Sequence, residues 1–390
     1  MASTTYAVDG SGSKYVATAT ALAGEVLAAH AADVDAAGRF PQEALEALAR
    51  SGLLGLFAPG QLGGGGQGPR VFAAVVEELA RGCASAALIY VMHVAGAQAI
   101  AASSALDSRD AILREIAAGR HLTTLALSEG RGGQPPWAPS SALEPRDGGY
   151  VVSARKALVA ATRHADSFVA SARCPGASSA VDTALFLMRP RAGEVRPRAL
   201  AVGLGLRGAE AAPVDIEGYR LGAADLVAAL GDGLRMSLEV VLPWQSVGLA
   251  ALANGIALAS VEATAAYLVG AGADGQREGS ELRDFAGPRA RLAEMSVRTE
   301  QARALLGQAV AVLEMDAPSS TVVSMQSRLA ALAAARDVTE LAVTVGSAAQ
   351  SRALPVERWF RDARAASIVA PSAEHLQDCI GRVLTGLPVV

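Results

Sequence analysis

The spacing of apolar residues changes twice along this chain of 390 residues. Up to about residue 120, apolar residues recur with helical spacing, and Pro41 and Pro69 each stand where a helix can begin. From about 121 to 230, the apolar segments are short, β-favouring and separated by Gly, Pro and Asp. From about 231 the helical spacing returns. The sequence therefore predicts an N-terminal α domain, a middle antiparallel β domain and a C-terminal four-helix bundle.

The expected domains are residues 1–120, 121–230 and 231–390. In the middle region, four segments have the composition of strands: 121–128, 149–153, 167–171 and 184–188. In the last region, four segments have helical spacing: 231–272, 285–314, 318–350 and 373–385.

The composition restricts which residues can fill the core and which kinds of partner the protein can bind. Half of the residues are hydrophobic but only 4% are aromatic, so Ala, Val and Leu have to fill the core. The formal net charge is −4, with both signs interspersed, which argues against nucleic-acid or membrane-surface binding. The expected ligand is a small molecule.

The cysteines and the apolar runs suggest a cytoplasmic protein. Cys83, Cys174 and Cys379 lie far apart without metal-site or disulfide spacing, which fits a reducing compartment. The first ten residues lack the pattern of a secretion signal. The most apolar run, 246–261, contains Asn254 and many small residues, and we expect it to be a buried bundle helix.

One glycine motif has the spacing of a dinucleotide-binding loop. Gly203-Leu-Gly-Leu-Arg-Gly208 matches G-x-G-x-x-G, but no strand–helix–strand unit surrounds it. We therefore do not expect a Rossmann-type site there.

The segment Pro355 to Ser372 resembles the block before the last helix of the acyl-CoA dehydrogenase superfamily. The pattern P-x-E-R-x-x-R-D-A-R is matched from Pro355 to Arg364, including Arg361 and Asp362. The resemblance covers about residues 35 to 390, and the superfamily's three-region plan agrees with the predicted fold. In that family, a glutamate after this block removes the α-proton of an acyl thioester while FAD takes the β-hydride.

The position of that glutamate is occupied by Ala370, whose methyl group cannot accept a proton. Some family members carry the base on the first bundle helix, where this chain has Gln245, an amide that is not a base near neutral pH. Glu374, four residues after Ala370, is a possible substitute or a solvated residue at a helix start.

The family's flavin-ring contacts are only partly kept. The stretch is Ser128-Glu-Gly-Arg-Gly-Gly-Gln134. In it, Ser128 retains the family's hydroxyl group, and Gly133 retains the glycine that lets the backbone approach the flavin closely. Leu158 and Ala160 stand where the family has a tryptophan and a threonine against the ring. A ring stack and a hydrogen bond are thereby lost.

The contacts to the other end of FAD also differ. Ala271 replaces an arginine, Asp274 an aromatic residue, and Thr344 a glutamine. Because Asp274 would repel a diphosphate, the sequence predicts a protein without a cofactor, with FAD as the alternative.

Four further residues are candidates for the pocket, each with a plain structural alternative. His93 is a site residue or a core histidine bonded to a backbone carbonyl. Trp137 caps the cavity or anchors a loop, and Trp244 lines the cavity or belongs to the core. Arg131 anchors an anion or is solvated.

We therefore expect an enzyme of bacterial specialised metabolism that uses the inherited cavity for a non-redox cyclisation or rearrangement of a polyketide-like substrate. The catalytic candidates are Gln245, Ser128, Glu374 and His93, and the substrate-binding candidates are Trp137, Arg131, Trp244, Leu158 and Ala370. The alternatives are an FAD-dependent acyl-thioester dehydrogenase or flavin monooxygenase, and a non-catalytic partner subunit of an active homologue. We expect a homodimer or a homotetramer.

Overall fold

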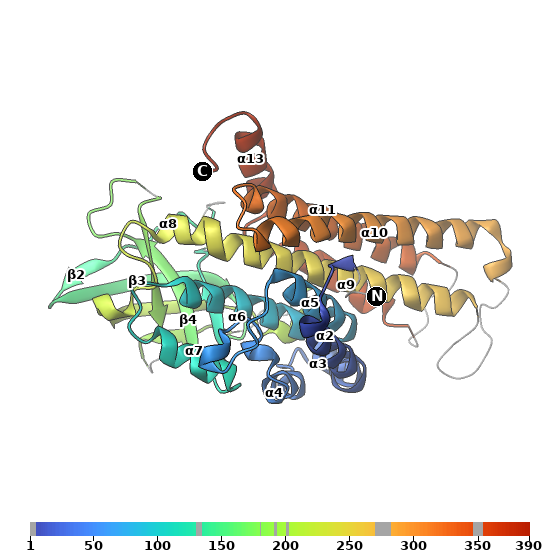
Figure 1. Cartoon of the computed structure of the whole chain (residues 1–390), viewed down its shortest axis with the longest axis horizontal. Helices are drawn as coiled ribbons and strands as arrows, with labels where there is room; N and C mark the ends of the chain where they lie inside the picture. Colours follow the sequence, from blue (N-terminus) through green and yellow to red (C-terminus); the bar gives the residue numbers. More distant parts are fainter. Residues whose placement is uncertain are drawn as a thin grey trace.

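The computed structural model describes residues 5–129, 135–179, 181–190, 193–199, 203–269, 282–345 and 354–390. It has the three predicted regions, with the strands at one end of an elongated body and long helices at the other (Figure 1). The predicted acyl-CoA dehydrogenase fold is confirmed.

The N-terminal region contains the helices α2 (Gly10–Leu22), α3 (Ala28–Ala37), α4 (Gln42–Arg50), α5 (Pro69–Gly82), α6 (Ala84–Ala102) and α7 (Arg109–Ala117). A π-helical turn, Ala23–Leu27, joins α2 to α3. As predicted, Pro69 occupies the first turn of α5. Gly52 lies just beyond α4 with a φ of 77°, which a glycine adopts without steric cost.

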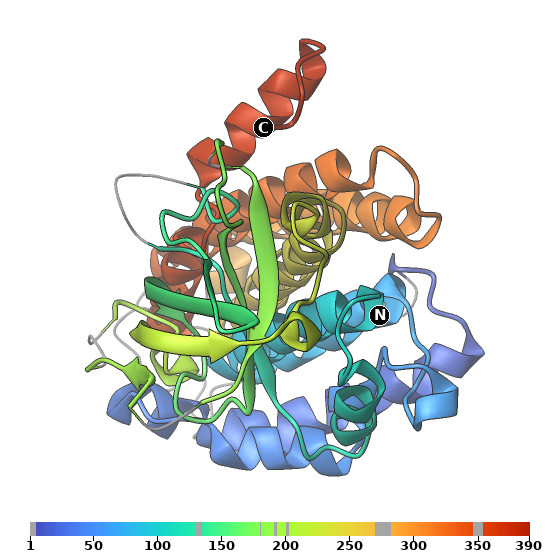
Figure 2. The ribbon, with the colours of Figure 1, turned by 90° about the vertical axis from the view of Figure 1, so that its left-hand side faces the viewer.

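The middle region contains β1 (Thr123–Ala126), β2 (Glu144–Arg146), β3 (Gly149–Val159), β4 (Ser167–Arg173), β5 (Thr183–Met188), β6 (Val195–Pro197) and β7 (Ala212–Leu221). They form two sheets, β1-β4-β5 and β2-β3-β7-β6 (Figure 2). Pairing is antiparallel except between β1 and β4. This parallel pair is possible because the chain visits the second sheet between the two strands.

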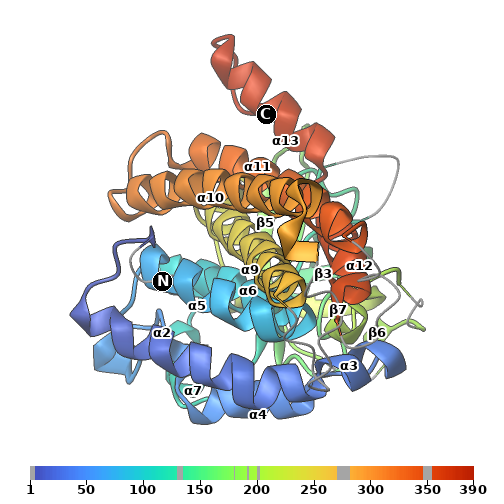
Figure 3. The same cartoon turned by 90° about the vertical axis from the view of Figure 1, so that its right-hand side faces the viewer.

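The C-terminal region contains α8 (Gly233–Met236), α9 (Leu242–Leu268), α10 (Ala286–Glu314), α11 (Ser320–Val343), α12 (Val356–Ser367) and α13 (Ala373–Leu384). A π-helical turn, Ser237–Val241, joins α8 to α9. Figure 3 shows α5, α6 and α9 between the α2–α4 helices and the α10–α11 pair, with α13 projecting from the body.

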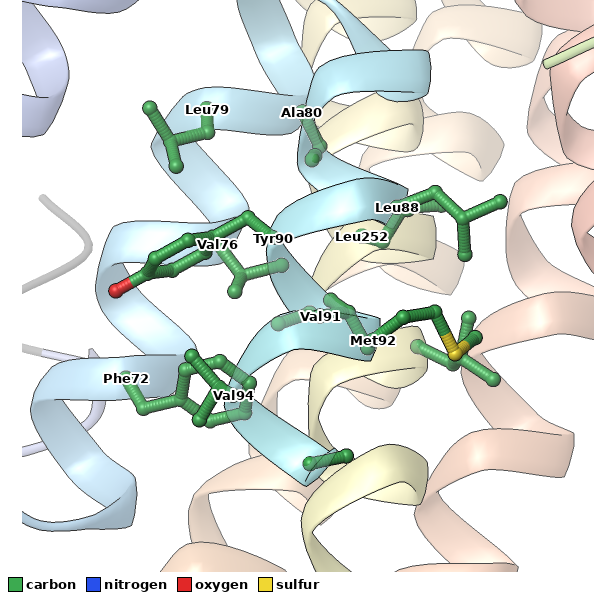
Figure 4. Packing of buried hydrophobic residues seen from close by; sticks show 14 of the residues in the cluster. Phe72, Val76, Leu79, Ala80, Leu88, Tyr90, Val91, Met92, Val94 and Leu252 are labelled. Carbon is green, nitrogen blue, oxygen red and sulfur yellow. The ribbon is translucent and has the colours of Figure 1, made fainter. Parts of the chain in front are cut away.

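Small residues let the helices approach closely enough to form a core with few aromatic rings. A Cβ added at Gly255 of α9 would lie 2.4 Å from the Glu77 carbonyl oxygen of α5, and one at Gly248 would lie 2.6 Å from Val91 of α6. Figure 4 shows the resulting packing of Phe72, Val91 and their neighbours. The core is therefore dense despite its short side chains.

Two helices have the length and hydropathy of membrane spans, namely α6 and the continuous helix over 233–268. In their most apolar windows, 89% and 78% of the residues are buried inside the protein. They are core helices here, in agreement with the prediction for 246–261.

One buried ion pair connects α5 to α10. Arg303 is 2.9 Å from Glu77 through Nη2 and 3.1 Å through Nε, and the Tyr6 hydroxyl also donates to Glu77. Against the effect of burial, Glu77 raises the pKa of Arg303. This arginine is a fully paired buried cation, since Glu300 accepts from its Nη1.

Candidate active site

A cavity of about 380 Å³ lies between the segment 203–211, strand β3 and the end of α12. Three large hydrophobic side chains stand open on its wall: Leu158 is 51% exposed, Leu204 59% and Ile368 74%. Side chains of this kind are normally buried, so the wall is suited to an apolar ligand.

The block on α12 that resembles the superfamily pattern, Pro355 to Arg364, holds this wall in place. Arg361 pairs with Asp35, with Nη2 2.6 Å from Oδ2, and its Nη1 donates to the Leu204 carbonyl at 3.0 Å. Asp362 accepts from the Leu206 N–H at 2.6 Å. A Cβ on Gly205 would lie 2.3 Å from the Arg361 carbonyl oxygen, so this position requires glycine. The Gly203–Gly208 motif thus packs against α12 and does not form a Rossmann loop.

Two arginines add positive charge to the wall. Arg364 stacks on Phe360, with its guanidinium carbon 3.3 Å from the ring centroid, and donates to Glu340 at 3.1 Å. Among the described residues, the buried Nε of Arg207 has no hydrogen-bond partner, and its Nη2 donates to the Ala36 carbonyl at 3.4 Å. No carboxylate lines this cavity within the described chain. The wall therefore favours an apolar group that carries negative charge.

The predicted base position lies at the edge of this cavity. Ala370 follows Val369, which lines the cavity, and is half-buried. Glu374 is exposed in the first turn of α13, and hydrogen bonding to Ser372 lowers its pKa. A low pKa favours the ionised form but weakens a carboxylate as a base.

Gln245 and Trp244 lie on the first turn of α9. Gln245 is buried, and its amide nitrogen lies 3.6 Å from the Met92 sulfur. Trp244 packs against Phe72, with ring centroids 5.6 Å apart. Both contacts are with the helical core.

His93 has both ring nitrogens occupied by the backbone. Nε2 lies 3.0 Å from the Leu54 carbonyl, and Nδ1 accepts from the Thr123 N–H at 3.1 Å. This pattern requires the Nε2–H tautomer. Burial lowers the pKa of His93 to about 4, so the imidazole is neutral near pH 7.

Trp137 is buried in a small apolar cluster with Leu242, Met325 and Leu376. It connects the middle region to α9, α11 and α13 and does not line the cavity described above. Its position agrees with loop anchoring. Arg131 and Gly133 lie outside the described residues, as do Ala271 and Asp274.

Ser128 lies next to a buried ion pair that sequence reasoning missed. Its carbonyl accepts from Ala157 at 2.8 Å, beside Leu158. Glu129 and the fully buried Lys156 are 2.8 Å apart, and Glu129 also accepts from Ser140 and Ser141. Although burial opposes ionisation, Lys156 and these hydrogen bonds lower the pKa of Glu129 to about 2. The pair fixes the chain on both sides of 130–134.

Among the predicted site residues that the structure describes, Leu158 alone lines the cavity, and Ala370 adjoins it. The missed wall residues are Leu204, Arg207, Arg364 and Ile368. The sequence already pointed to these residues, because they belong to the Gly203–Gly208 motif and to the block that begins at Pro355. The contact between the two motifs was not visible there.

Comparison with known proteins gives two family matches. Residues 13–120 match the acyl-CoA dehydrogenase N-terminal domain, and residues 231–385 match the acyl-CoA dehydrogenase C-terminal domain. A probable acyl-CoA dehydrogenase, fadE25, of Mycobacterium leprae is 27% identical over 355 residues, which cover 90% of each chain. The acryloyl-CoA reductase (NADH) of Anaerotignum propionicum is 26% identical, covering 90% of this chain and 89% of its own.

Solved structures agree on the fold. Butyryl-CoA dehydrogenase from Megasphaera elsdenii superposes with a TM-score of 0.89 and 21% identity, covering 97% of this chain and 99% of its own. PigA, solved as an FAD complex, superposes with a TM-score of 0.87 and 18% identity, covering 97% and 98%.

These similarities correct two predictions. The prediction of a protein without a cofactor is contradicted, because the full-length relatives are acyl-CoA dehydrogenases and PigA of the same fold was solved with FAD. The predicted non-redox cyclisation has no support among them. The sequence shows which family contacts are changed, but it does not show the apolar wall and the two arginines that only the folded chain brings together. The chain belongs to the acyl-CoA dehydrogenase superfamily.

Proposed function

We propose that this protein is an FAD-dependent oxidoreductase that acts on acyl thioesters. The observation that carries the proposal is the position of the cavity, whose wall combines Leu158, at the family's flavin-stacking position, with Ile368 and Val369 beside the family's base position. Relatives named acyl-CoA dehydrogenases, similar over nine-tenths of the chain, support the same class.

The residues present fit the flavin part of FAD. A volume of about 380 Å³ is enough for one ring system, and the rest of the dinucleotide would extend beyond it. Leu158, Leu204 and Ile368 would pack on the apolar ring, and the Arg207 side chain would place positive charge near a negatively charged or carbonyl group. When bound, FAD would supply a two-electron acceptor for a substrate hydride.

The chain's own contribution to proton transfer differs from the family's. Ala370 and Gln245 provide no base at the two family positions, and Glu374 lies exposed on α13. With no base at either family position among the described residues, we propose that the α-proton leaves to water or to a group of the substrate itself. We expect slow turnover with simple saturated acyl-CoA substrates for this reason.

A flavin monooxygenase is the second candidate, and the alanine at position 370 favours it. Such an enzyme needs an external reductant and oxygen but no carboxylate at this position. It is distinguished by oxygen uptake that depends on substrate and on reduced cofactor. Anaerobic flavin reduction by an acyl thioester alone would identify the dehydrogenase.

FAD binding tests the proposal directly. Wild-type protein should purify yellow or take up close to one FAD per chain, measured by absorbance after denaturation. Leu158→Asp should weaken binding by about tenfold or more, because it places a charge on the apolar wall. Leu387→Asp is the matched control, since Leu387 is 52% exposed and belongs to the C-terminal segment. Absence of FAD uptake by wild type would refute the proposal.

A further inference from the structure

Arg207, in the segment that joins β6 to β7, contributes its side chain to the wall of the 380 Å³ cavity. Within the part of the chain that the structure describes, it forms no ion pair, and its Nη2 donates to a neutral group, the Ala36 carbonyl, at 3.4 Å. The side chain is half-buried, so its charge borders the cavity on one side and packed protein on the other. No carboxylate of the described chain compensates this positive charge.

Arg364, on α12, lines the same cavity but has an ionic partner. Its Nη2 donates to Glu340 of α11 at 3.1 Å, and Glu340 is 65% exposed. Its guanidinium also stacks on the Phe360 ring. The two arginines therefore differ in one respect that matters for a bound ligand: the charge of Arg364 is balanced by a carboxylate, and that of Arg207 is not.

The carboxylates behind this wall are engaged with other arginines. Arg361 pairs with Asp35 at 2.6 Å and also with Glu357. Burial raises the pKa of Asp362 to about 6, and the charges of Arg358 and Arg361 oppose this effect. None of these carboxylates is among the residues that line the cavity. The charge nearest to a bound ring is therefore positive.

The ring that would occupy this cavity changes its charge when it reacts. The oxidised ring is neutral, and uptake of a hydride, which is two electrons and one proton, gives it one negative charge. A positive charge on the wall stabilises the negatively charged form whichever edge of the ring faces it, because the sign of the interaction does not depend on orientation. The apolar wall around Leu158, Leu204 and Ile368 strengthens the interaction by excluding water.

We propose that Arg207 raises the affinity of this protein for reduced over oxidised FAD and thereby makes the bound flavin a stronger electron acceptor. Arg364 contributes less, because Glu340 compensates its charge. The inference rests on the proposed function for the presence of FAD. It goes further by assigning the residue that sets the reduction potential of the cofactor.

The test measures the reduction potential of FAD bound to the full-length protein, by spectroscopic titration against a reference dye of known potential. Arg207→Gln should reduce the preference for reduced FAD by about tenfold, which for a two-electron couple lowers the potential by about 30 mV. Arg207→Lys keeps the charge and should retain the preference to within about threefold. A role of Arg207 in folding alone would not produce this difference between two variants that both bind FAD.

The ion pair of Arg364 supplies two further variants with shifts of opposite sign. Arg364→Gln should lower the potential, but by less than Arg207→Gln does. Glu340→Gln should raise it by about twofold in the affinity ratio, because the charge of Arg364 is then uncompensated, and solvent keeps the effect of this exposed residue small. Arg50→Gln on α4 is the control, since Arg50 is 72% exposed and does not line the cavity.

FAD uptake is measured first, because absence of uptake by wild type refutes the proposed function and this inference with it. If FAD binds, an equal potential in wild type and Arg207→Gln overturns the inference alone. So does an equal loss in Arg207→Gln and Arg207→Lys, or a shift in Arg50→Gln as large as that in Arg207→Gln. If Arg207→Gln does not fold, Arg364→Gln and Glu340→Gln decide, and the absence of opposite shifts overturns the inference.

Discussion

The carboxylate of Asp362 accepts a hydrogen bond of 2.6 Å from the backbone N–H of Leu206, 156 residues earlier in the chain. Leu206 has a φ of 51°, in the left-handed region that a leucine rarely adopts. The hydrogen bond therefore stabilises a costly backbone conformation next to the cavity. Through this contact, the family block on α12 shapes the opposite wall of the site.

Asp362 should make stability depend on pH. Burial raises its pKa from 3.8 to about 6, so the folded state binds the proton more tightly than the unfolded chain does. The raised pKa contributes roughly 3 kcal/mol to the free energy of unfolding. This contribution is fully present below about pH 4 and is lost as the pH rises through about 6. Urea unfolding from pH 4 to 7 should therefore show a difference between wild type and Asp362→Asn that changes within this window. A pH-independent difference would contradict the assignment.

His93 should make the stability depend on pH in the opposite direction. Burial lowers its pKa from 6.5 to about 4, so its stabilising contribution is complete above pH 6.5 and is lost as pH falls toward 4. His93→Gln should remove this dependence, worth roughly 3 kcal/mol over the window. The same urea series detects it. The two variants should show slopes of opposite sign, which makes each the control of the other.

The ion pair between Lys156 and Glu129 should be essential for the stability of the cavity wall around Leu158. Lys156→Met leaves a buried carboxylate unpaired and should cost about 3–5 kcal/mol in the free energy of unfolding. The double variant Lys156→Met, Glu129→Gln should recover part of that loss, since no charge remains. A double variant as unstable as the single one would show that the hydrogen bonds of Glu129 to Ser140 and Ser141 dominate.

Restoring a carboxylate at position 370 should not by itself restore acyl-CoA dehydrogenation. In Ala370→Glu, the nearby Arg328 would lower the pKa of the new carboxylate and weaken it as a base. Anaerobic flavin bleaching by butyryl-CoA should therefore stay slow. In the double variant with Arg328→Gln, it should become at least about tenfold faster. Fast bleaching by Ala370→Glu alone would refute this account.

The protein should assemble as a homodimer or homotetramer. The α10 region exposes apolar side chains, with Val297 56% exposed, Phe285 60% and Met315 70%. Symmetric pairing would cover such a surface. Val297→Arg should shift the sedimentation coefficient toward the monomer at micromolar concentration, and Val383→Arg on α13 serves for comparison. A monomeric wild type would contradict the prediction.

The order of the regions followed from local patterns. Helical and strand-like spacings and Pro69 at a helix start depend on the conformation of neighbouring residues, and these predictions agreed with the structure. The family pattern from Pro355 to Arg364 could also be recognised in the sequence, because its residues are consecutive and lie on or next to one short helix.

The site was decided by contacts between distant segments. The sequence identified Ala370 as a missing base, but it could not show that Arg328 donates to the carbonyls of Val369 and Pro371 on either side of it. Nor could it show that Arg207 and Arg364 share a cavity wall. Whether an arginine is solvated, paired or buried alone depends on which helices pack around it. That packing depends on how side chains are buried throughout the core. The pattern of residues next to one arginine in the sequence therefore does not predict it.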